Sequence, residues 1–356
     1  MFEQRLHEVR KHLETSRLDA LFVSHLPHVR YLTGFTGSNG LCIITRRRQF
    51  FLTDNRYRDQ AKDEVSDYAI LVARDSPLEA ARKRFLLKGQ KRVGFESQYV
   101  SHATSNSFKR LFVGSVLVPT QSIVERIASI KDDSEIELLK KAAAITDKAF
   151  RKVLQILKPG IAEREVAAEI SYWHRRFGAD GDGFEAIVAS GVRGALPHGR
   201  ASEKKIRKGE LVTLDFGCRF AGYHSDLTRT VAVGRPNNRA KKIYSIVLDA
   251  QCKAIDAARS GITARFLDGV ARRHIRVAGY GKYFSHSLGH GLGIEIHEPL
   301  RLSAKSKDIL SAGNVVTIEP GIYIPGFGGV RIEDDVVIRE NGCEVLTHAP
   351  KELVIL

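Results

Sequence analysis

Four acidic residues in two predicted strand–turn–strand segments constrain the fold of this chain more than any other feature of its sequence. Asp215 and Asp226 lie in the first segment and Glu319 and Glu333 in the second, and none of them has a cationic residue next to it in the sequence. If the fold brings these carboxylates together, their mutual repulsion and loss of hydration would cost several kcal/mol. Because a pair of divalent cations would remove that cost, the pattern predicts a two-metal site.

The first acidic segment is predicted to be a β-hairpin. Residues 211–218 and 223–234 are rich in apolar and β-branched side chains, and an Arg-Phe-Ala-Gly turn lies between them. If the hairpin is centred between the second and third residues of that turn, Asp215 and Asp226 are direct cross-strand partners with Cβ atoms about 5 Å apart. Taken alone, the segment is equally compatible with one exposed aspartate and a second one in a turn.

The second acidic segment repeats this pattern. Residues 315–324 and 329–338 are predicted strands joined by a Pro-Gly-Phe-Gly turn. Centring the hairpin on Gly326 places Glu319 opposite Glu333.

Alternation along the returning strand distributes its charged residues over two faces. Val330, Ile332, Val336 and Ile338 share one face, while Arg331 and Glu333 share the other. A guanidinium is therefore expected beside the acid pair. Asp334 is expected on the apolar face, which makes it a poorer ligand candidate than Glu333.

A histidine-rich segment, residues 283–299, lies between the two acidic hairpins. It contains His286, His290 and His297, and the glycines around the middle histidine allow backbone to approach an ion closely. A lone histidine is more often structural than a metal ligand, but three histidines between two acidic hairpins favour ligation. The Gly-His-Gly-Leu-Gly stretch is not a dinucleotide loop, because the third glycine of G-x-G-x-x-G is missing and no Walker lysine is present.

These motifs identify a family resemblance that extends from the first domain to the last strand. The chain resembles the aminopeptidase P and prolidase family, the proline-specific branch of the pita-bread metallopeptidases, and looks most like bacterial Xaa-Pro aminopeptidases. The motifs that carry the resemblance are GFTGSNG (34–40), LTDNRY (52–57), LPHG (196–199), TLDFG (213–217), SDLTRT (225–230), HGLG (290–293), EPGIY (319–323) and GVRIEDD (329–335).

The resemblance implies a complete set of metal ligands. Asp215 is expected to chelate one ion, His290 and Glu319 the other, and Asp226 and Glu333 to bridge both. Four carboxylates and one imidazole form a hard, oxygen-rich site, and two-metal hydrolases hold their ions about 3.5 to 4 Å apart. The resemblance implies manganese as the native ion, with cobalt as an effective substitute and zinc as a third candidate.

The same resemblance implies roles for residues around the ions. Glu319 is the expected proton shuttle for a solvent nucleophile activated between the two ions. His198 and His297 are expected to orient the substrate and stabilise the oxyanion, and His286 to line the substrate cavity. Arg331 and Tyr323 are expected to fix the orientation of the ligand carboxylates. For Arg331, a salt bridge at the solvent surface is the alternative interpretation.

Two domains are expected. Residues 1–129 alternate short apolar strands with amphipathic helical stretches, which predicts an α/β N-terminal domain. Its expected strands span 20–24, 41–45, 49–53, 69–72, 92–96 and 115–118. Residues 130–356 are expected to form an α+β pita-bread catalytic domain.

The second domain carries two further local signals. It is predicted to open with a long helix in which Ser134 and Glu137 are spaced as a capping box. GIAER (160–164) and GITAR (261–265) each follow one helical stretch and open another. This faint duplication, with one acidic hairpin per half, predicts two halves that close around a shared cavity.

Composition excludes several other classes of protein. The four cysteines form no CxxC pair, which favours a reducing compartment. The charged start lacks an apolar signal region and no run approaches 18 apolar residues, so we expect a cytoplasmic protein with no membrane partner. The net charge of +15 is spread along the chain without a long basic tail, and we therefore expect no nucleic-acid partner.

The expected activity is that of an Xaa-Pro aminopeptidase, which releases the first residue from short peptides with proline in the second position. Xaa-Pro dipeptidase (prolidase) is the alternative. Methionine aminopeptidase and a non-catalytic peptide- or protein-binding relative are less favoured, because LPHG, GVRIEDD and the front domain argue against the former and the intact ligands against the latter. GFTGSNG and LTDNRY favour the aminopeptidase, and the resemblance also implies a homodimer.

Overall fold

The computed structural model describes residues 2–74 and 76–356. The chain divides into two compact units between Ala128 and Ser129, one residue before the boundary expected from the sequence. Among the described residues, no helix has both the length and the apolar character needed to cross a membrane.

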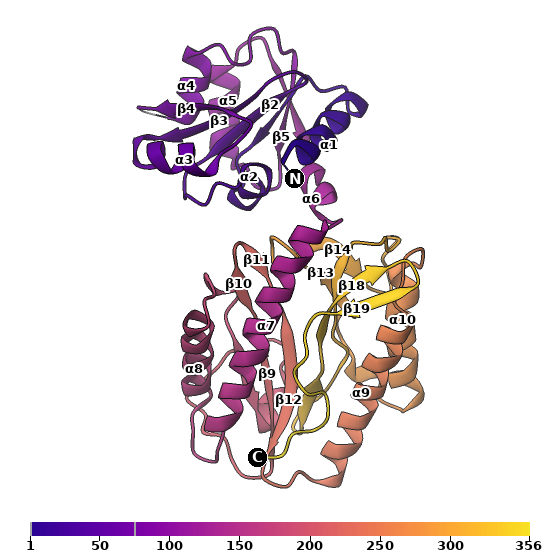
Figure 1. Ribbon diagram of the computed structural model, residues 1–356. Coiled ribbons are helices and arrows are strands. Elements are labelled where there is room, and N and C mark those ends of the chain that lie inside the picture. Colours follow the sequence, from indigo (N-terminus) through magenta and orange to yellow (C-terminus); the bar gives the residue numbers. More distant parts are fainter. Residues whose placement is uncertain (1, 75) are drawn as a thin grey trace. The chain divides into compact units, whose positions relative to one another are not determined.

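The first unit is an α/β domain built on one six-stranded mixed sheet of order β4-β3-β2-β1-β5-β6 (Figure 1). β1 pairs antiparallel with β2, and β2 with β3, whereas β1–β5, β3–β4 and β5–β6 are parallel. Its elements are α1 (Phe2–Thr15), β1 (Ala20–Val23), α2 (Leu26–Thr33), β2 (Leu41–Thr45), β3 (Gln49–Asp54), η1 (Asn55–Tyr57), α3 (Arg58–Glu64), β4 (Ala69–Ala73), α4 (Pro77–Lys83), β5 (Arg92–Glu96), α5 (His102–Leu111), β6 (Val116–Thr120) and α6 (Ile123–Ala128).

All six strands expected in this unit are present, each within two residues of its expected ends. Their apolar residues pack against the helices in one core that includes Phe22, Ile43, Leu52 and Phe108. Alternating short apolar runs and amphipathic stretches were therefore sufficient to predict an α/β layer.

The first half of the second unit packs two helices against a three-stranded sheet of order β12-β9-β8. Phe150 of the first helix and Ile170 of the second lie in one core with Val212 and Val231 of the sheet. The elements of this half are α7 (Asp133–Ile156), α8 (Glu163–Arg176), β7 (Gly181–Asp182), β8 (Ile187–Ser190), η2 (Gly191–Ala195), β9 (Glu210–Phe216), β10 (Cys218–Phe220), β11 (Tyr223–His224) and β12 (Leu227–Val233).

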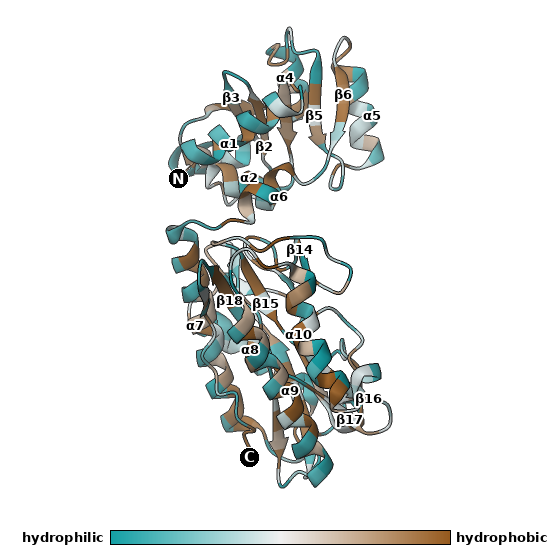
Figure 2. Cartoon of the chain, turned by 90° about the vertical axis from the view of Figure 1, so that its right-hand side faces the viewer, coloured by the Kyte–Doolittle hydropathy of each residue, from teal (hydrophilic) through white to brown (hydrophobic). Residues whose placement is uncertain are grey.

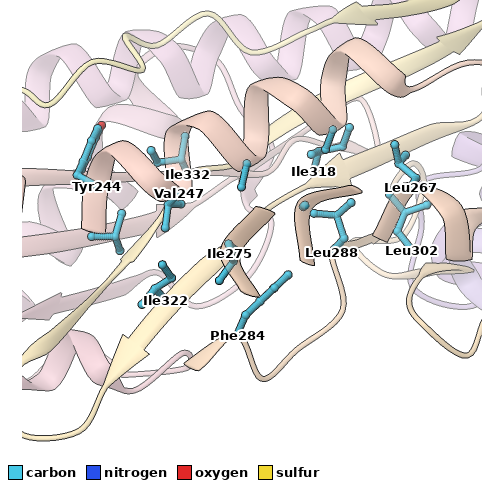
Figure 3. Packing of buried hydrophobic residues seen from close by; sticks show 14 of the residues in the cluster. Tyr244, Val247, Leu267, Ile275, Phe284, Leu288, Leu302, Ile318, Ile322 and Ile332 are labelled. Carbon is cyan, nitrogen blue, oxygen red and sulfur yellow. The ribbon is translucent and has the colours of Figure 1, made fainter. Parts of the chain in front are cut away.

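The second half packs two helices against a five-stranded sheet of order β14-β13-β15-β18-β19 and the β16–β17 hairpin. Figure 3 shows Tyr244 and Val247 in the same buried cluster as Ile318, Ile322 and Ile332. The elements are α9 (Asn238–Ala257), α10 (Ala264–Val277), η3 (Gly281–Tyr283), β13 (Gly289–Gly291), β14 (Glu298–Leu302), β15 (Val315–Ile318), β16 (Gly321–Ile324), β17 (Gly328–Arg331), β18 (Asp334–Arg339) and β19 (Gly342–Val345).

The faint sequence duplication corresponds to a duplicated helix pair. α7 is followed by α8 and α9 by α10, and Figure 1 shows the two pairs on opposite flanks of the strands of this unit. Gly160 and Gly261 begin the two repeated motifs, and both adopt a left-handed backbone, with φ of 96° and 83°. All four helices carry hydrophilic and hydrophobic residues, as Figure 2 shows, so each can bury one face and expose the other.

The expected cap of the long helix was wrong. α7 begins two residues earlier than the Ser134–Glu137 pair implies, because its capping box is formed by Asp132 and Glu135. The Asp132 side chain accepts a hydrogen bond from the backbone N–H of Glu135, and the Glu135 carboxylate accepts one from the N–H of Asp132. Ser134 instead donates its hydroxyl to Asp132 Oδ1 at 2.5 Å.

The predicted register of the first acidic hairpin was also wrong. Asp215 pairs with Thr228 rather than with Asp226, because the tight turn is centred between Ala221 and Gly222. Both turn residues have positive φ, 48° and 88°, as a two-residue type I′ hairpin requires. A left-handed alanine is uncommon, and its presence at the first turn position displaced the predicted centre by one residue.

The predicted register of the second acidic hairpin is confirmed. Ile318 pairs with Asp334 before the acids, and Gly321 pairs with Arg331 after them, so Glu319 lies opposite Glu333. Both acids lie in the short interruptions between consecutive strands rather than within a ladder.

Candidate metal centre

The acidic hairpins meet where β12 of one half lies against the segment between β17 and β18 of the other. The backbone N–H of Glu333 donates to the carbonyl of Thr228 at 3.1 Å. The hydroxyl of Thr228 in turn donates to Glu333 Oε2 at 2.6 Å. The two halves of the domain are thus joined at the acid cluster itself.

The ligand candidates converge at this junction. Potential ligand atoms of Asp226, His290 and Glu333 all lie within 4.8 Å of one another, and all three residues are buried. His290 Nε2 is 3.7 Å from Asp226 Oδ2 and 3.8 Å from Glu319 Oε1. Asp215 is linked to the same cluster through Arg331, which donates to Asp215 Oδ2 and to the hydroxyl of Thr228, the partner of Glu333.

His290 is oriented as a ligand would be. Its Nδ1 lies 3.1 Å from the carbonyl oxygen of Gly291, so this nitrogen carries the proton and donates it. The other ring nitrogen, Nε2, then presents its lone pair to the carboxylates. A glycine precedes the histidine because a Cβ on Gly289 would lie 1.9 Å from the carbonyl oxygen of Thr317 on the neighbouring strand.

The carboxylates are too close and too buried to be ionised together without added cations. Burial, followed by repulsion from Glu333 and Asp215, raises the pKa of Asp226 well above its usual value. Burial and the Glu333 charge do the same for Glu319. Burial and the Asp215 charge raise the pKa of Glu333 to about 8. Divalent cations would remove this penalty, and the donor set therefore fits them.

Asp226 is held by a residue that sequence reasoning did not select. Its backbone N–H donates to Asp335 Oδ2 at 2.8 Å. Within the described parts of the chain, Asp226 Oδ1 and Asp335 Oδ1 are both buried without a hydrogen-bond partner. The run Glu333-Asp334-Asp335 was the available signal, because alternation places Asp335 on the same face as Arg331 and Glu333.

Arg331 links the acid cluster to its surroundings, on the face that alternation predicted. Its Nη2 donates to Asp215 Oδ2, and its Nε donates to Thr228 Oγ1 at 3.0 Å. Its Nη1 donates to the hydroxyl of Tyr323 at 2.8 Å and to the carbonyl of Pro197 at 3.1 Å. This buried guanidinium therefore orients one candidate ligand and holds the segment that contains the LPHG motif.

His286 completes this hydrogen-bonded chain. Its Nε2 lies 2.8 Å from the Tyr323 hydroxyl and its Nδ1 lies 2.8 Å from the carbonyl of Ser287. Burial, with a smaller effect of the Arg331 charge, lowers the pKa of His286 to about 3. The imidazole is therefore neutral near pH 7, and it lies 3.9 Å from Glu319 Oε2.

The remaining two histidines of the expected site are exposed beside the cluster. The ring of His297 lies edge-on to that of His290, with centroids 4.4 Å apart. His198 directly follows Pro197, whose carbonyl oxygen accepts a hydrogen bond from Arg331 at 3.1 Å. These contacts link the expected site residues to the acid cluster, and their roles at a metal centre stay predictions.

Arg301 is a further neighbour that sequence reasoning missed. It is exposed on β14 and is the direct cross-strand partner of His290. Burial lowers the pKa of His297, and the Arg301 charge lowers it further. Among residues 2–74 and 76–356, no hydrogen bond or ion pair is made by the Arg301 side chain. Its guanidinium is available to a ligand, and no sequence signal marked it because the pairing arises only in the sheet.

Asp334 lies outside the cluster, as its predicted apolar face implied. Its Oδ1 accepts from Arg229 Nη2 at 2.7 Å and from the hydroxyl of Thr347 at 2.8 Å. Its Oδ2 accepts from Gln251 Nε2 at 2.7 Å and lies 2.5 Å from the ammonium of Lys351. These partners lower its pKa despite complete burial, and leave no oxygen free for a cation.

Buried carboxylates and an imidazole between two similar halves of an α+β domain define a metal-dependent hydrolase. Comparison with known proteins agrees with this class. Residues 137–340 match the model of metallopeptidase family M24, and residues 5–130 match the creatinase/prolidase N-terminal domain. The chain belongs to the M24 metallopeptidases, with the N-terminal domain and pita-bread catalytic domain that the resemblance implied.

Three similar proteins illustrate the relationship. The Xaa-Pro dipeptidase of Pyrococcus horikoshii is 38% identical over 99% of both chains. The structure of an Xaa-Pro dipeptidase from Bacillus anthracis superposes with a TM-score of 0.98, at 42% identity and full coverage of both chains. An X-Pro aminopeptidase from Thermotoga maritima superposes with a TM-score of 0.91, at 37% identity over 95% of this chain and 98% of the other.

Proposed function

We propose that Asp215, Asp226, His290, Glu319 and Glu333 hold two divalent ions. Asp226 and Glu333 would bridge the ions, as the family resemblance implies; ligand atoms of both lie within 4.8 Å of those of His290 and of each other. The oxygen-rich donor set suits manganese, with cobalt or zinc as alternatives. When bound, such ions polarise a scissile carbonyl and lower the pKa of a water molecule.

The residues around the ions have separate roles in this proposal. Glu319 accepts the proton of the attacking water and passes it to the leaving nitrogen. His198 and His297 are exposed at the site and donate to the developing oxyanion. Arg331 keeps Asp215 in place, while Tyr323 connects Arg331 to His286 through hydrogen bonds of 2.8 Å.

We propose Xaa-Pro dipeptides as the substrates. The observation that carries this choice is Arg301, whose guanidinium lies beside His290 and His297 without a protein partner among the described residues. In a dipeptide the carboxylate that follows the scissile bond is free, and a guanidinium binds a carboxylate in a bidentate manner. The similar proteins from Pyrococcus horikoshii and Bacillus anthracis are both named Xaa-Pro dipeptidases.

Xaa-Pro aminopeptidase activity is the second candidate, because the Thermotoga maritima protein superposes closely. The GFTGSNG and LTDNRY motifs are weaker evidence for an aminopeptidase than the sequence analysis assumed. Asn39 of the first motif donates to Asp54 of the second at 2.6 Å, and Asp54 pairs with Arg56 at 2.8 Å. These side chains stabilise the first unit, so the motifs do not by themselves indicate substrate length.

Peptides of increasing length test the proposal. We expect manganese-loaded protein to hydrolyse Xaa-Pro at a higher kcat/KM than Xaa-Pro-Xaa or longer peptides. Arg301→Gln should raise KM for Xaa-Pro and leave KM for the tripeptide unchanged, because only the dipeptide places a carboxylate there. Arg265→Gln, which changes an exposed arginine of α10, is the matched control. Equal or faster cleavage of longer peptides would establish the aminopeptidase instead.

Two other expectations stay predictions: the homodimer that the resemblance implied and the cytoplasmic location that composition favoured. Light scattering of the metal-loaded protein at micromolar concentration tests the first. A monomer with full activity would contradict it.

A further inference from the structure

Glu163, the first residue of α8, is a fully buried carboxylate outside the acid cluster. Its Oε1 accepts from both the backbone N–H and the hydroxyl of Ser190, each at 2.8 Å. Its Oε2 accepts from Arg193 Nη1 at 2.8 Å, from the hydroxyl of Ser202 at 2.7 Å and from the backbone N–H of Ser202 at 3.2 Å. Five hydrogen bonds thus compensate for the burial of one charge.

These donors tie together the two ends of a loop, residues 190–202. Ser190 is the last residue of β8, and the chain returns to the same carboxylate at Ser202. Arg193 strengthens the closure, since its Nη1 also donates to Ser202 Oγ at 2.7 Å and its Nη2 donates to the carbonyl of Arg200 at 2.7 Å. His198 lies inside the loop that this network closes.

The middle of the loop is connected to the acid cluster through Arg331. Arg331 Nη1 donates to the carbonyl of Pro197, the residue before His198. The loop also lies directly against β17, because a Cβ on Gly329 would come within 2.1 Å of the carbonyl oxygen of Gly194. The segment around His198 is therefore held next to its middle by Arg331 and at both ends by Glu163.

We propose that Glu163, together with Arg193, is a positioning residue that holds His198 in its place at the metal centre. The inference rests on the proposed function, in which His198 donates to the oxyanion. A glutamine at 163 would keep the size of the side chain but could accept at only one of its two terminal atoms. Its NH₂ group would face either the Ser190 donors or the Arg193 and Ser202 donors, and one end of the loop would be released.

A double-mutant cycle tests this relation, with kcat, KM and bound metal measured for each variant. We expect Glu163→Gln to keep two metal ions and near-normal KM while kcat falls about 10- to 100-fold, because a displacement of about 1 Å at a reacting centre can cost 100-fold. In a His198→Ala background, Glu163→Gln should change kcat by less than about 2-fold, because the imidazole that Glu163 positions is already absent.

Asp147→Asn is the matched control. Asp147 is another buried carboxylate of this unit that accepts two backbone N–H groups, those of His348 and Ala349, at 2.8 and 2.9 Å. Its substitution should lower thermal stability without a selective loss of kcat. Amide hydrogen exchange should show faster exchange within 191–200 in Glu163→Gln but not in Asp147→Asn.

The outcomes separate this inference from the function on which it rests. If His198→Ala lowers kcat but Glu163→Gln does not, or if the two effects multiply in the double variant, the positioning role is overturned. If His198→Ala keeps full kcat, the proposed role of His198 fails first and the positioning role fails with it. Should Glu163→Gln not fold, Arg193→Lys takes its place in the cycle, because a lysine cannot reach Glu163, Ser202 and the Arg200 carbonyl at once.

Discussion

Arg331 donates to a carboxylate oxygen of Asp215, and both side chains are buried at the junction of the two acidic hairpins. This pair places one permanent positive charge beside an acid cluster that otherwise requires metal ions. Because the same guanidinium also reaches Tyr323, Thr228 and the carbonyl of Pro197, the orientation of Asp215 is coupled to the loop that carries His198. Its geometry, as well as its charge, is therefore expected to matter.

Arg331→Lys should weaken metal binding and lower turnover about 10- to 100-fold, the range typical of residues that orient metal ligands. A lysine keeps the charge, but its single ammonium group cannot donate to all four acceptors that the planar guanidinium reaches. Metal titration followed by calorimetry, combined with kcat on an Xaa-Pro dipeptide, checks both effects. Normal affinity and turnover in this variant would show that the charge alone suffices.

Removal of the metal should abolish activity, and manganese or cobalt should restore it. Asp226→Asn and Glu333→Gln should lose both ions, whereas Asp215→Asn should retain one, because a bridging ligand serves two ions. Metal content of the purified variants by mass spectrometry checks this order. Full activity in a rigorously metal-free preparation would refute the metal centre altogether.

His198→Ala and His297→Ala should each keep two ions while turnover falls. Loss of one preorganised donor to an oxyanion costs about 10²- to 10³-fold in rate, roughly 3 to 4 kcal/mol. In these variants kcat should therefore fall while the number of bound metal ions per chain stays at two. A variant that loses an ion would instead identify its histidine as a metal ligand.

Gly217→Ala should destabilise the protein by more than about 2 kcal/mol. A Cβ at this position would lie 1.7 Å from the carbonyl oxygen of Ser225, immediately before Asp226, so the backbone has to move. Gly269→Ala, in the interior of α10, is the matched control, because nothing lies within 4 Å of the added atom. That substitution should raise stability by up to about 1 kcal/mol through helix propensity. Urea denaturation of both variants checks the contrast.

The sequence was sufficient for features that depend on neighbouring residues. The strands of the first unit and the register of the second acidic hairpin follow from alternation and from a turn centred on Gly326. Local reasoning failed at two places for different reasons. Ala221 adopts a left-handed backbone at φ 48°, which its residue type does not indicate, and this displaced the first hairpin. At α7 the pairs Asp132–Glu135 and Ser134–Glu137 have the same spacing, and the first pair forms the cap.

Only the tertiary structure decided which distant groups serve the site. Arg301 opposite His290 and Glu163 at the two ends of the His198 loop leave no periodic trace in the sequence, because each contact joins segments from different elements. Asp335 shares the face of Glu333, but its hydrogen bond with the Asp226 backbone appears only in the fold. Alternation and motif spacing report which face a residue occupies within its own strand. Which residues lie across that face depends on how the two halves of the domain close, and this is determined by the packing of both cores.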